Sequence, residues 1–180
     1  MSNIKKVAVV GTGVIGAGWI IRCLAHGKIV HAYDKNFKLK RNLFFEIKRT
    51  WPFVKKLFNK KKLDFKNFKY FTSLKEALND VDFVQECAPE NYSIKIKLIN
   101  SISKNIKKNI IISSSSSGLL PSKIFSKSLN PERGIIGHPF NPVYLLPLVE
   151  IVPGKKTNKK YLNDAKKFYQ SISMNPIIVK

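Results

Sequence analysis

The segment from Val7 to Asp34 constrains the fold more than any other part of the chain. It reads VAVVGTGVIGAGWIIRCLAHGKIVHAYD, an apolar run, a glycine-rich loop, a helical pattern and a second apolar run that ends on an acid. Gly11 allows a tight turn after the first strand, Gly13 lets the backbone approach a pyrophosphate, and Gly16 lets the helix pack closely on the sheet. The order of these parts predicts a strand, loop, helix and strand that together bind a dinucleotide.

The start of the predicted helix is the expected phosphate site. Its first N–H groups are unpaired and the helix dipole is positive there, so an anion is favoured. Asp34 stands eighteen residues after Gly16, where a carboxylate accepts hydrogen bonds from the adenosine ribose hydroxyls and repels a 2′-phosphate. The sequence therefore favours NAD over NADP, with Lys35 and Lys38 weakening the discrimination. The residues expected at the phosphates are Gly11, Thr12, Gly13, Val14, Ile15 and Gly16.

The length and composition are those of one globular domain. We expect residues 1–180 to form a single NAD-binding domain, because no linker or internal repeat divides the 180 residues. No apolar run has the length of a membrane span or the pattern of a signal peptide, so we expect a cytoplasmic protein without a membrane partner. Cys23 and Cys87 form no CxxC motif and fit a reducing compartment.

The formal net charge of +22 raises the question of a nucleic-acid partner. Only four of the 33 basic residues are arginines, and the lysines are spread along the chain. Lysine gives no bidentate readout of bases, and aromatic and basic residues do not interleave as in RNA-binding proteins. We therefore expect solvated lysine faces and no nucleic-acid partner.

Alternating strands and helices predict an α/β fold, a Rossmann-like, doubly wound and mainly parallel sheet. Residues 36–62 carry apolar positions at helical spacing, but Pro52 interrupts them, so we expect two helices with the second starting near Thr50. Strands are predicted at residues 5–10, 29–33, 68–71, 81–85, 109–112, 134–137, 149–152 and 176–179. Further helices are predicted at residues 14–25, 73–78 and 91–106, after Pro121, and at residues 159–172.

Ligands bind at the carboxyl ends of the strands in such sheets, and polar residues gather there in this sequence. Five serines, residues 113–117, lie between an apolar strand and an apolar turn, so they are not a flexible linker. Their hydroxyls can donate to a substrate oxygen or a nicotinamide ribose. His138 follows the next strand, and Glu150 comes twelve residues later. Spacing alone does not show whether these two side chains meet.

Five motifs taken together carry a resemblance to a known family. They are GTGVIGAG, QECAPEN, SSSSSGLLPS, GHPFNP and PLVEIVPG, in this order, and they span almost the whole chain. Together they resemble the NAD-binding domain of the L-3-hydroxyacyl-CoA dehydrogenase superfamily. Within it, the serine run and HPFNPVYLLPLVE are more similar to the L-carnitine 3-dehydrogenases than to the acyl-CoA enzymes, which usually carry Asn-Thr at Ser115 and Ser116. The branch of lambda-crystallin and L-gulonate dehydrogenase is also similar.

The resemblance implies a role for individual residues. His138 matches the family's catalytic base, Glu150 the carboxylate that holds its imidazole, and Ser117 the serine that binds the reacting oxygen. Glu90, Lys95 and Ser115 match positions near the cofactor. Other interpretations remain open, since Glu86 suits a structural carboxylate and Glu90 suits a helix cap with Asn91. His26 and His31 are interpreted as core histidines bonded to backbone carbonyls, and no metal site is expected.

The implied function is an NAD-dependent dehydrogenase that oxidises the 3-hydroxyl of a short L-3-hydroxy acid, with L-carnitine to 3-dehydrocarnitine first. The alternatives are an L-3-hydroxyacyl-CoA dehydrogenase of fatty-acid metabolism and, from another class, a non-catalytic dinucleotide-binding module or half of a split enzyme. Family members continue into a helical domain that forms the dimer and closes over the substrate. We therefore expect a small-molecule substrate, a homodimer only if that domain is supplied, and weak activity of these residues alone.

Overall fold

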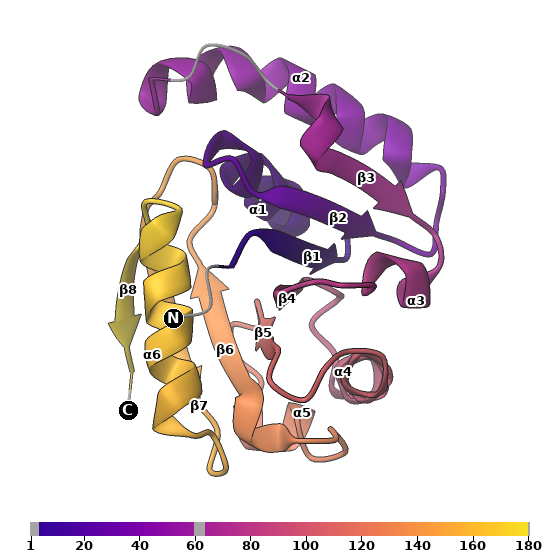
Figure 1. The fold of residues 1–180 in the computed structure, drawn as a ribbon, viewed down its shortest axis with the longest axis vertical. Coiled ribbons are helices and arrows are strands. Elements are labelled where there is room, and N and C mark those ends of the chain that lie inside the picture. The colour runs from indigo at the N-terminus through magenta and orange to yellow at the C-terminus, as the bar shows by residue number, and fades with distance from the viewer. Residues whose placement is uncertain (1–3, 60–63, 180) are drawn as a thin grey trace.

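An eight-stranded sheet forms the centre of the structure, a computed structural model that describes residues 4–59 and 64–179 (Figure 1). The strand order is β3-β2-β1-β4-β5-β6-β7-β8, and every neighbouring pair is parallel except β6 with β7. This confirms the predicted doubly wound, mainly parallel sheet. The strand order reverses between β1 and β4, since β2 and β3 extend the sheet on one side of β1, and β4 to β8 extend it on the other. In doubly wound sheets, ligands bind beyond the carboxyl ends of the strands at such a point.

The elements follow the predicted alternation. The strands are β1 Lys6–Val10, β2 Ile29–Tyr33, β3 Phe68–Phe71, β4 Phe83–Glu86, β5 Ile111–Ser114, β6 Gly134–Pro139, β7 Leu148–Pro153 and β8 Asn175–Ile178. The helices are α1 Val14–Ala25, α2 Leu39–Leu57, α3 Leu74–Ala77, α4 Tyr92–Lys104, α5 Pro121–Ile124 and α6 Lys159–Ser171, with short 3-10 turns at Phe65–Asn67 and Pro131–Arg133. The largest extensions beyond a predicted strand end are two residues, at β5, which runs into the serine run, and at β6, which runs through His138.

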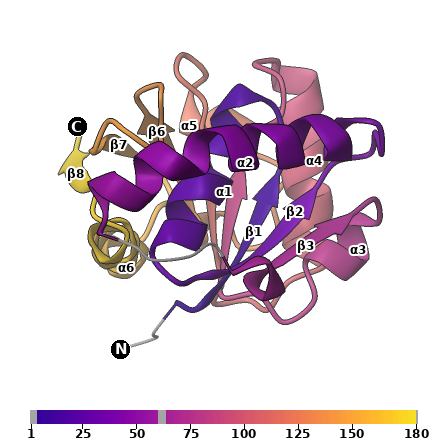
Figure 2. The ribbon, with the colours of Figure 1, turned by 90° about the horizontal axis from the view of Figure 1, so that it is seen from above.

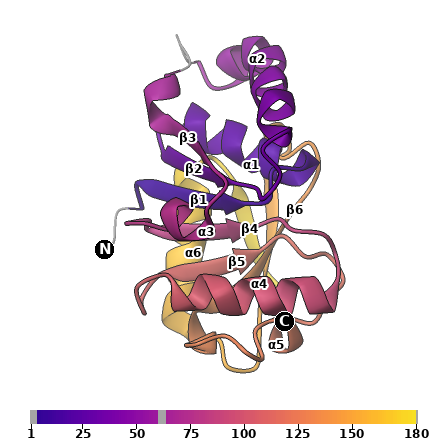
Figure 3. The ribbon, with the colours of Figure 1, turned by 90° about the vertical axis from the view of Figure 1, so that its right-hand side faces the viewer.

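Helices cover both faces of the sheet and divide the core in two. Val7 and Val9 pack on the face that carries α1, α2 and α6, whereas Ala8 and Val10 pack on the face of α3, α4 and α5. This division follows from the strand, whose successive side chains point to opposite faces. Figure 3 shows α4 in front of the sheet with α6 behind it.

The segment around Pro52 corrects one prediction, because α2 is a single helix from Leu39 to Leu57 rather than two. Pro52 lies on the exposed side, where water can bond the carbonyl that the proline leaves without an N–H. The buried side chains of Ile47 and Val54 lie on either side of the proline and hold one continuous apolar face against the core. Figure 2 shows α2 lying across α1. Residues 60–62 of the predicted helical stretch lie outside the described residues.

The strand direction changes in the second half of the sheet. β7 runs antiparallel to β6, and β8 runs parallel to β7 at the edge of the sheet. In this register His138 stands directly opposite Glu150. Within the described ranges, no helix is long and apolar enough to cross a membrane.

Candidate active site

The glycine loop leaves β1 and enters α1 through a turn that only small residues fit. Gly11 has a φ of +101°, and a Cβ there would lie 2.7 Å from the carbonyl oxygen of Cys87. A Cβ at Gly16 would collide with the carbonyl oxygen of Gly11, so α1 can only pack this close to the loop without a side chain there. Two of the three glycines are therefore required by the packing of the protein itself.

Gly13 has no such internal requirement. It is the N-cap residue of α1, no side chain caps the helix there, and a Cβ would meet nothing within 4 Å. The absence of a side-chain cap at the start of α1 and the open space beside Gly13 fit a pyrophosphate.

Asp34 lies at the carboxyl end of β2 and is bonded to the glycine loop. Its Oδ2 accepts hydrogen bonds from the Thr12 N–H at 3.1 Å and from the Thr12 hydroxyl at 3.2 Å, and its Oδ1 accepts from the Asn36 N–H at 3.1 Å. A carboxylate oxygen can accept more than one bond, so ribose hydroxyls can still bind. The link between Asp34 and Thr12 fixes the end of β2 against the loop.

A cavity of about 290 Å³ lies beyond the ends of β4, β5 and β6. It brings together six of the predicted site residues and adds three that the sequence did not single out for this site, Cys87, Ala88 and Pro139. The predicted residues along it are Ile15, Glu90, Lys95, Ser115, Ser117 and His138. Asp34 lies outside this cavity, on the β2 side of the glycine loop.

His138 and Glu150 form a hydrogen-bonded pair between neighbouring strands. The His138 Nδ1 lies 2.9 Å from the Glu150 Oε2, and both side chains are half-buried. The antiparallel pairing of β6 and β7 places them opposite each other, so residues twelve apart in the chain become direct neighbours. The ring of Phe140 lies 5.4 Å from the imidazole.

One face of the serine run carries a network without formal charge, which we call the neutral network. Ser113 contacts the Tyr169 hydroxyl at 2.7 Å, and that hydroxyl donates to Gln85 Oε1 at 2.8 Å. The Gln85 amide nitrogen donates to Ser115 at 2.8 Å, and the Trp19 indole donates to the same oxygen at 3.1 Å. The resemblance had pointed to Ser115 alone. The sequence signal for the rest was the polar Gln85, which directly follows the apolar Phe83 and Val84 in a buried strand.

The other face carries charges, and we call it the ionic network. Lys95 of α4 donates to both oxygens of Glu86 at 2.9 and 3.0 Å and to the Ala88 carbonyl at 2.9 Å. Ser114 donates to Glu86, and both members of the ion pair are at most 1% exposed. Glu86 therefore has the structural role left open by the sequence. Two hydrogen bonds to Glu86 and one to Ala88 hold Lys95 at the wall of the cavity. Its predicted contact with the cofactor stays a prediction.

Glu90 holds the end of the serine run. Its Oε1 accepts from the Ser116 hydroxyl at 2.5 Å, the Ser117 N–H at 3.0 Å and the Gly118 N–H at 3.1 Å. Burial acts to raise the pKa of Glu90, but these bonds and the charge of Lys95 outweigh it and leave the pKa below its ordinary value. Asn91 alone caps α4, by accepting from the Ile94 N–H.

The remaining histidines and cysteines have other surroundings. His26 and His31 each contact a backbone carbonyl, of Arg22 at 2.8 Å and of Ala77 at 3.0 Å, as predicted. His31 is buried, as expected of a core histidine, whereas His26 is only half-buried. Burial raises the pKa of the Cys87 thiol to about 12, so it stays protonated. In the part of the chain that the structure describes, no cluster of three or more His, Cys, Asp or Glu side chains is arranged to hold a metal ion.

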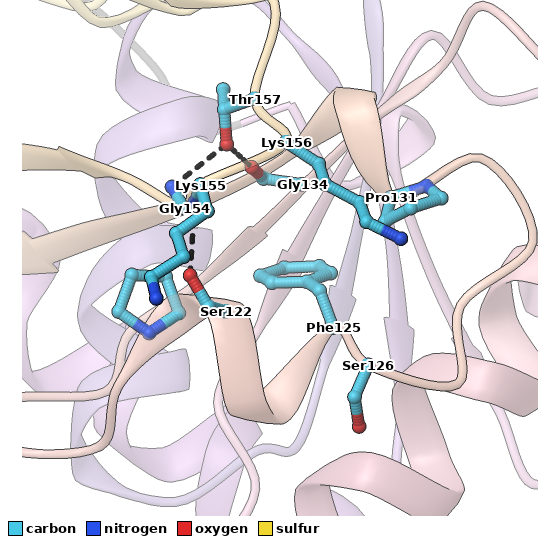
Figure 4. A pocket seen from close by; sticks show the side chains of 10 residues that line it. Ser122, Phe125, Ser126, Pro131, Gly134, Gly154, Lys155, Lys156 and Thr157 are labelled. Carbon is cyan, nitrogen blue, oxygen red and sulfur yellow. Dashed lines mark hydrogen bonds between the residues drawn. The ribbon is translucent and has the colours of Figure 1, made fainter.

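A second cavity, of about 250 Å³, lies at the end of β6 opposite to His138 (Figure 4). Phe125 lines one side of this cavity. At another side the Thr157 hydroxyl donates a hydrogen bond to the Gly134 carbonyl at 2.7 Å. None of the predicted site residues lines this cavity. Six of the predicted site residues line the cavity beyond β4, β5 and β6 instead.

Comparison with known proteins shows which family the chain is similar to. Residues 6–180 match the family described as 3-hydroxyacyl-CoA dehydrogenase, NAD binding domain. The L-carnitine dehydrogenase of Pseudomonas putida is 41% identical over 180 residues, which cover all of this chain and 56% of the relative. That of Oceanobacillus iheyensis is 42% identical over 98% of this chain and 57% of its own length. The chain thus spans little more than half of these curated relatives.

A solved structure shows the same fold. The (S)-3-hydroxybutyryl-CoA dehydrogenase of Ralstonia eutropha superimposes with a TM-score of 0.92 at 27% sequence identity. The match covers 99% of this chain and 64% of that structure.

Proposed function

Because this chain belongs to the 3-hydroxyacyl-CoA dehydrogenase family, as its NAD-binding domain, we propose that it forms the cofactor half of a dehydrogenase for short L-3-hydroxy acids. The hydrogen-bonded pair of His138 and Glu150 beside the serine run carries this proposal. L-Carnitine, oxidised to 3-dehydrocarnitine, is the first substrate we propose. The homologous L-carnitine dehydrogenases at about 40% identity support that choice.

NAD supplies the hydride acceptor when it is bound. The open N-terminus of α1 at Gly13 suits its pyrophosphate, and the carboxylate of Asp34 suits its adenosine ribose. The neighbouring Val14 and Ile15 line the same end of the helix. The three residues proposed from the resemblance at the nicotinamide half, Glu90, Lys95 and Ser115, line the cavity beyond the loop.

His138 acts as the base in this proposal. The carboxylate of Glu150 can only accept, so the neutral imidazole carries its proton on Nδ1 and leaves Nε2 free. Nε2 takes the proton of the substrate hydroxyl, and the charge that develops on the ring is stabilised by Glu150. A charge-assisted hydrogen bond of this kind contributes about 1.5 to 3 kcal/mol.

Ser117 orients the reacting oxygen. It lines the cavity with His138, and its own backbone N–H is fixed by Glu90. A hydroxyl held in this way donates to the substrate oxygen, which directs the proton of that oxygen toward Nε2 of His138.

A CoA thioester is the second substrate we propose. The family description and the fold shared with a 3-hydroxybutyryl-CoA dehydrogenase support it. The aromatic Phe140 beside His138 supports carnitine, because an aromatic face binds a quaternary ammonium by cation–π attraction, and Tyr144 can add a second face. The two substrates differ in the group next to the carbons that react, which is a quaternary ammonium in carnitine and the thioester of CoA in the other.

The test is hydride transfer to NAD, followed by NADH absorbance, with L-carnitine, L-3-hydroxybutyryl-CoA and L-gulonate. The chain is assayed alone and joined to the remaining part of the Pseudomonas putida relative, whose helical half we expect to close the site and to form a homodimer. Oxidation of L-carnitine that falls at least 100-fold in His138→Asn is the expected result. NADH binding without oxidation of any substrate would leave a non-catalytic module, or half of a split enzyme with another partner.

Cofactor choice is tested at Asp34. Asp34→Asn keeps an acceptor for Thr12 but removes the charge, so we expect NADH to bind more weakly and NADPH to bind more tightly than in the wild type. Isothermal titration with both nucleotides measures the ratio of affinities. An unchanged ratio would show that Asp34 does not read the ribose.

A further inference from the structure

The neutral network contains three deeply buried polar side chains that the proposed proton transfer does not use. Gln85, Ser113 and Tyr169 are each at most 1% exposed, and they come from β4, β5 and α6. Polar groups at such depth are retained when every donor and acceptor is satisfied. Their bonds end at Ser115, whose side chain reaches the cavity.

The direction of each hydrogen bond in this network can be worked out. The Gln85 side-chain nitrogen lies 3.5 Å from the carbonyl oxygen of Gly137, which can only accept, so the amide donates on that side. The amide oxygen then faces Tyr169 and must receive the tyrosine proton. Because that proton is used, the contact between Ser113 and Tyr169 is a donation from Ser113.

These hydrogen-bond directions determine which group of Ser115 is left to bind a ligand. Its oxygen receives one N–H from Gln85 and one from Trp19, and these occupy both lone pairs. The hydroxyl proton is left as its free hydrogen-bonding group. Its nearest acceptor is the sulfur of Cys87 at 3.3 Å, a neutral thiol that accepts weakly. Ser115 therefore presents a donor that a better acceptor in the cavity can take.

We propose that Gln85 and Tyr169 are positioning residues that hold the Ser115 hydroxyl as a hydrogen-bond donor to the carboxamide oxygen of the nicotinamide of NAD. This inference rests on the proposed function. The nicotinamide end is the part concerned, because Ser115 and His138 line one cavity, whereas the phosphate site lies at the start of α1. Hydride transfer requires the nicotinamide beside the base.

The packing around Gly137 connects the neutral network to the strand that carries His138, the proposed base. A Cβ at Gly137 would collide with the Tyr169 hydroxyl and with the Ser113 hydroxyl, so the network lies directly against the backbone before His138. The rings of Trp19 and Tyr169 lie 5.3 Å apart and close the network on the α1 side. One set of contacts thus fixes both Ser115 and the strand that carries His138.

The experiment measures equilibrium binding of NADH and of ADP-ribose, which lacks the nicotinamide, to the full chain. We expect Ser115→Ala to weaken NADH binding about 10-fold, a loss of about 1.4 kcal/mol, and to leave ADP-ribose binding within twofold. Gln85→Glu, which places an acceptor against Ser115 and turns its proton inward, should match that loss. Tyr169→Phe should lose about threefold, and the control Ser113→Ala less than twofold.

A double variant shows whether Gln85 acts through Ser115. The combination of Ser115→Ala with Gln85→Glu should bind NADH no more weakly than Ser115→Ala alone. Additive losses, or equal losses of ADP-ribose and NADH, would overturn the proposal and leave the network a purely structural role. If Gln85→Glu does not fold, Gln85→Met removes the same donor with little change of shape and is expected to lose threefold or more.

The same measurements separate this inference from the function on which it rests. A wild-type chain that binds neither NADH nor ADP-ribose would remove the dinucleotide site itself. A wild-type chain that binds both, with variants at Gln85 and Tyr169 that bind NADH equally well, would remove only the positioning role.

Discussion

The two networks on either face of the serine run differ in charge, although they arise from the same two strands. Gln85 pairs with Ser113 across β4 and β5, and Glu86 pairs with Ser114 one step further on. Because successive residues of a strand point to opposite faces, the first pair faces α1 and α6 and the second faces α4. One step along the chain separates an amide network from a carboxylate network.

The difference in charge indicates which role suits each network. The ionic network pairs a buried ammonium with a buried carboxylate, and such a pair is stable only while both partners are present. The neutral network contains no formal charge, so losing one bond costs less, but the direction of its donors and acceptors is defined. We therefore assign rigidity of the site to the ionic network and orientation of Ser115 to the neutral one.

The largest effect is expected where the ionic network loses its cation. Lys95→Met leaves the carboxylate of Glu86 buried without its counter-charge, which should lower the free energy of unfolding by about 3 to 5 kcal/mol. Urea unfolding measures it. The double variant Lys95→Met with Glu86→Gln should recover most of the loss. A cost below about 1 kcal/mol for the single variant would remove the distinction between the two networks.

A second effect tests how tightly the neutral network packs. Gly137→Ala brings a methyl group against the hydroxyls of Tyr169 and Ser113, so we expect a loss of about 1 to 3 kcal/mol in unfolding free energy. Gly118→Ala is the matched control, because a Cβ there meets nothing within 4 Å. Equal stability of the two variants would mean that the backbone around Gly137 moves without cost.

Removal of a single hydroxyl from the neutral network should lower the free energy of unfolding by less than the two changes above. Tyr169→Phe leaves the Gln85 amide oxygen and the Ser113 hydroxyl without this partner, for which we expect a loss of about 1 to 2 kcal/mol. Thermal and urea unfolding measure it. In the Tyr169→Phe background, Gly137→Ala should cost less than in the wild type, since the larger obstacle is gone. Simple additivity of the two costs would argue against a shared contact.

The smallest effect is expected at Glu90, at the solvent side of the ionic network, where the side chain is 40% exposed. Its pKa lies below the ordinary value of 4.5, so the ionised form is favoured by folding. Its contribution is present above about pH 4.5 and is lost as the pH falls through the pKa of the folded state. Glu90→Gln should therefore lower the melting temperature at neutral pH and have no effect in stronger acid. A difference that persists unchanged at low pH would point to a cause other than charge.

Much of the fold could be predicted from the sequence because its signals are local. The glycine loop, the apolar runs and the caps at Ser73 and Asn91 each act within a few residues. The prediction at Pro52 was wrong for a physical reason, namely that buried contacts on one face of α2 outweigh one missing hydrogen bond on the exposed face. β5 lies two residues further along the chain than predicted, and β6 is two residues longer, because pairing with neighbouring strands carries a strand beyond its own apolar run.

The candidate site could be predicted less completely. Asp34, Ser117 and His138 lie at strand ends, where a parallel sheet places ligands, and the sequence indicated them. Gln85 and Tyr169 are 84 residues apart, and no local pattern relates them. The sequence also gave no sign that Asp34 bonds Thr12, since that contact depends on how the loop folds back on β2.

The alternation of strands and helices and the conformation of the glycine loop follow from the amino-acid sequence alone, since both depend on backbone geometry and on the spacing of apolar residues. Which side chains contact one another depends on the tertiary structure. The antiparallel register of β6 and β7 brings Glu150 to His138, and the alternation of β5 sends neighbouring serines to networks of different charge. Register and packing are set by contacts across the whole chain, and no short segment encodes them.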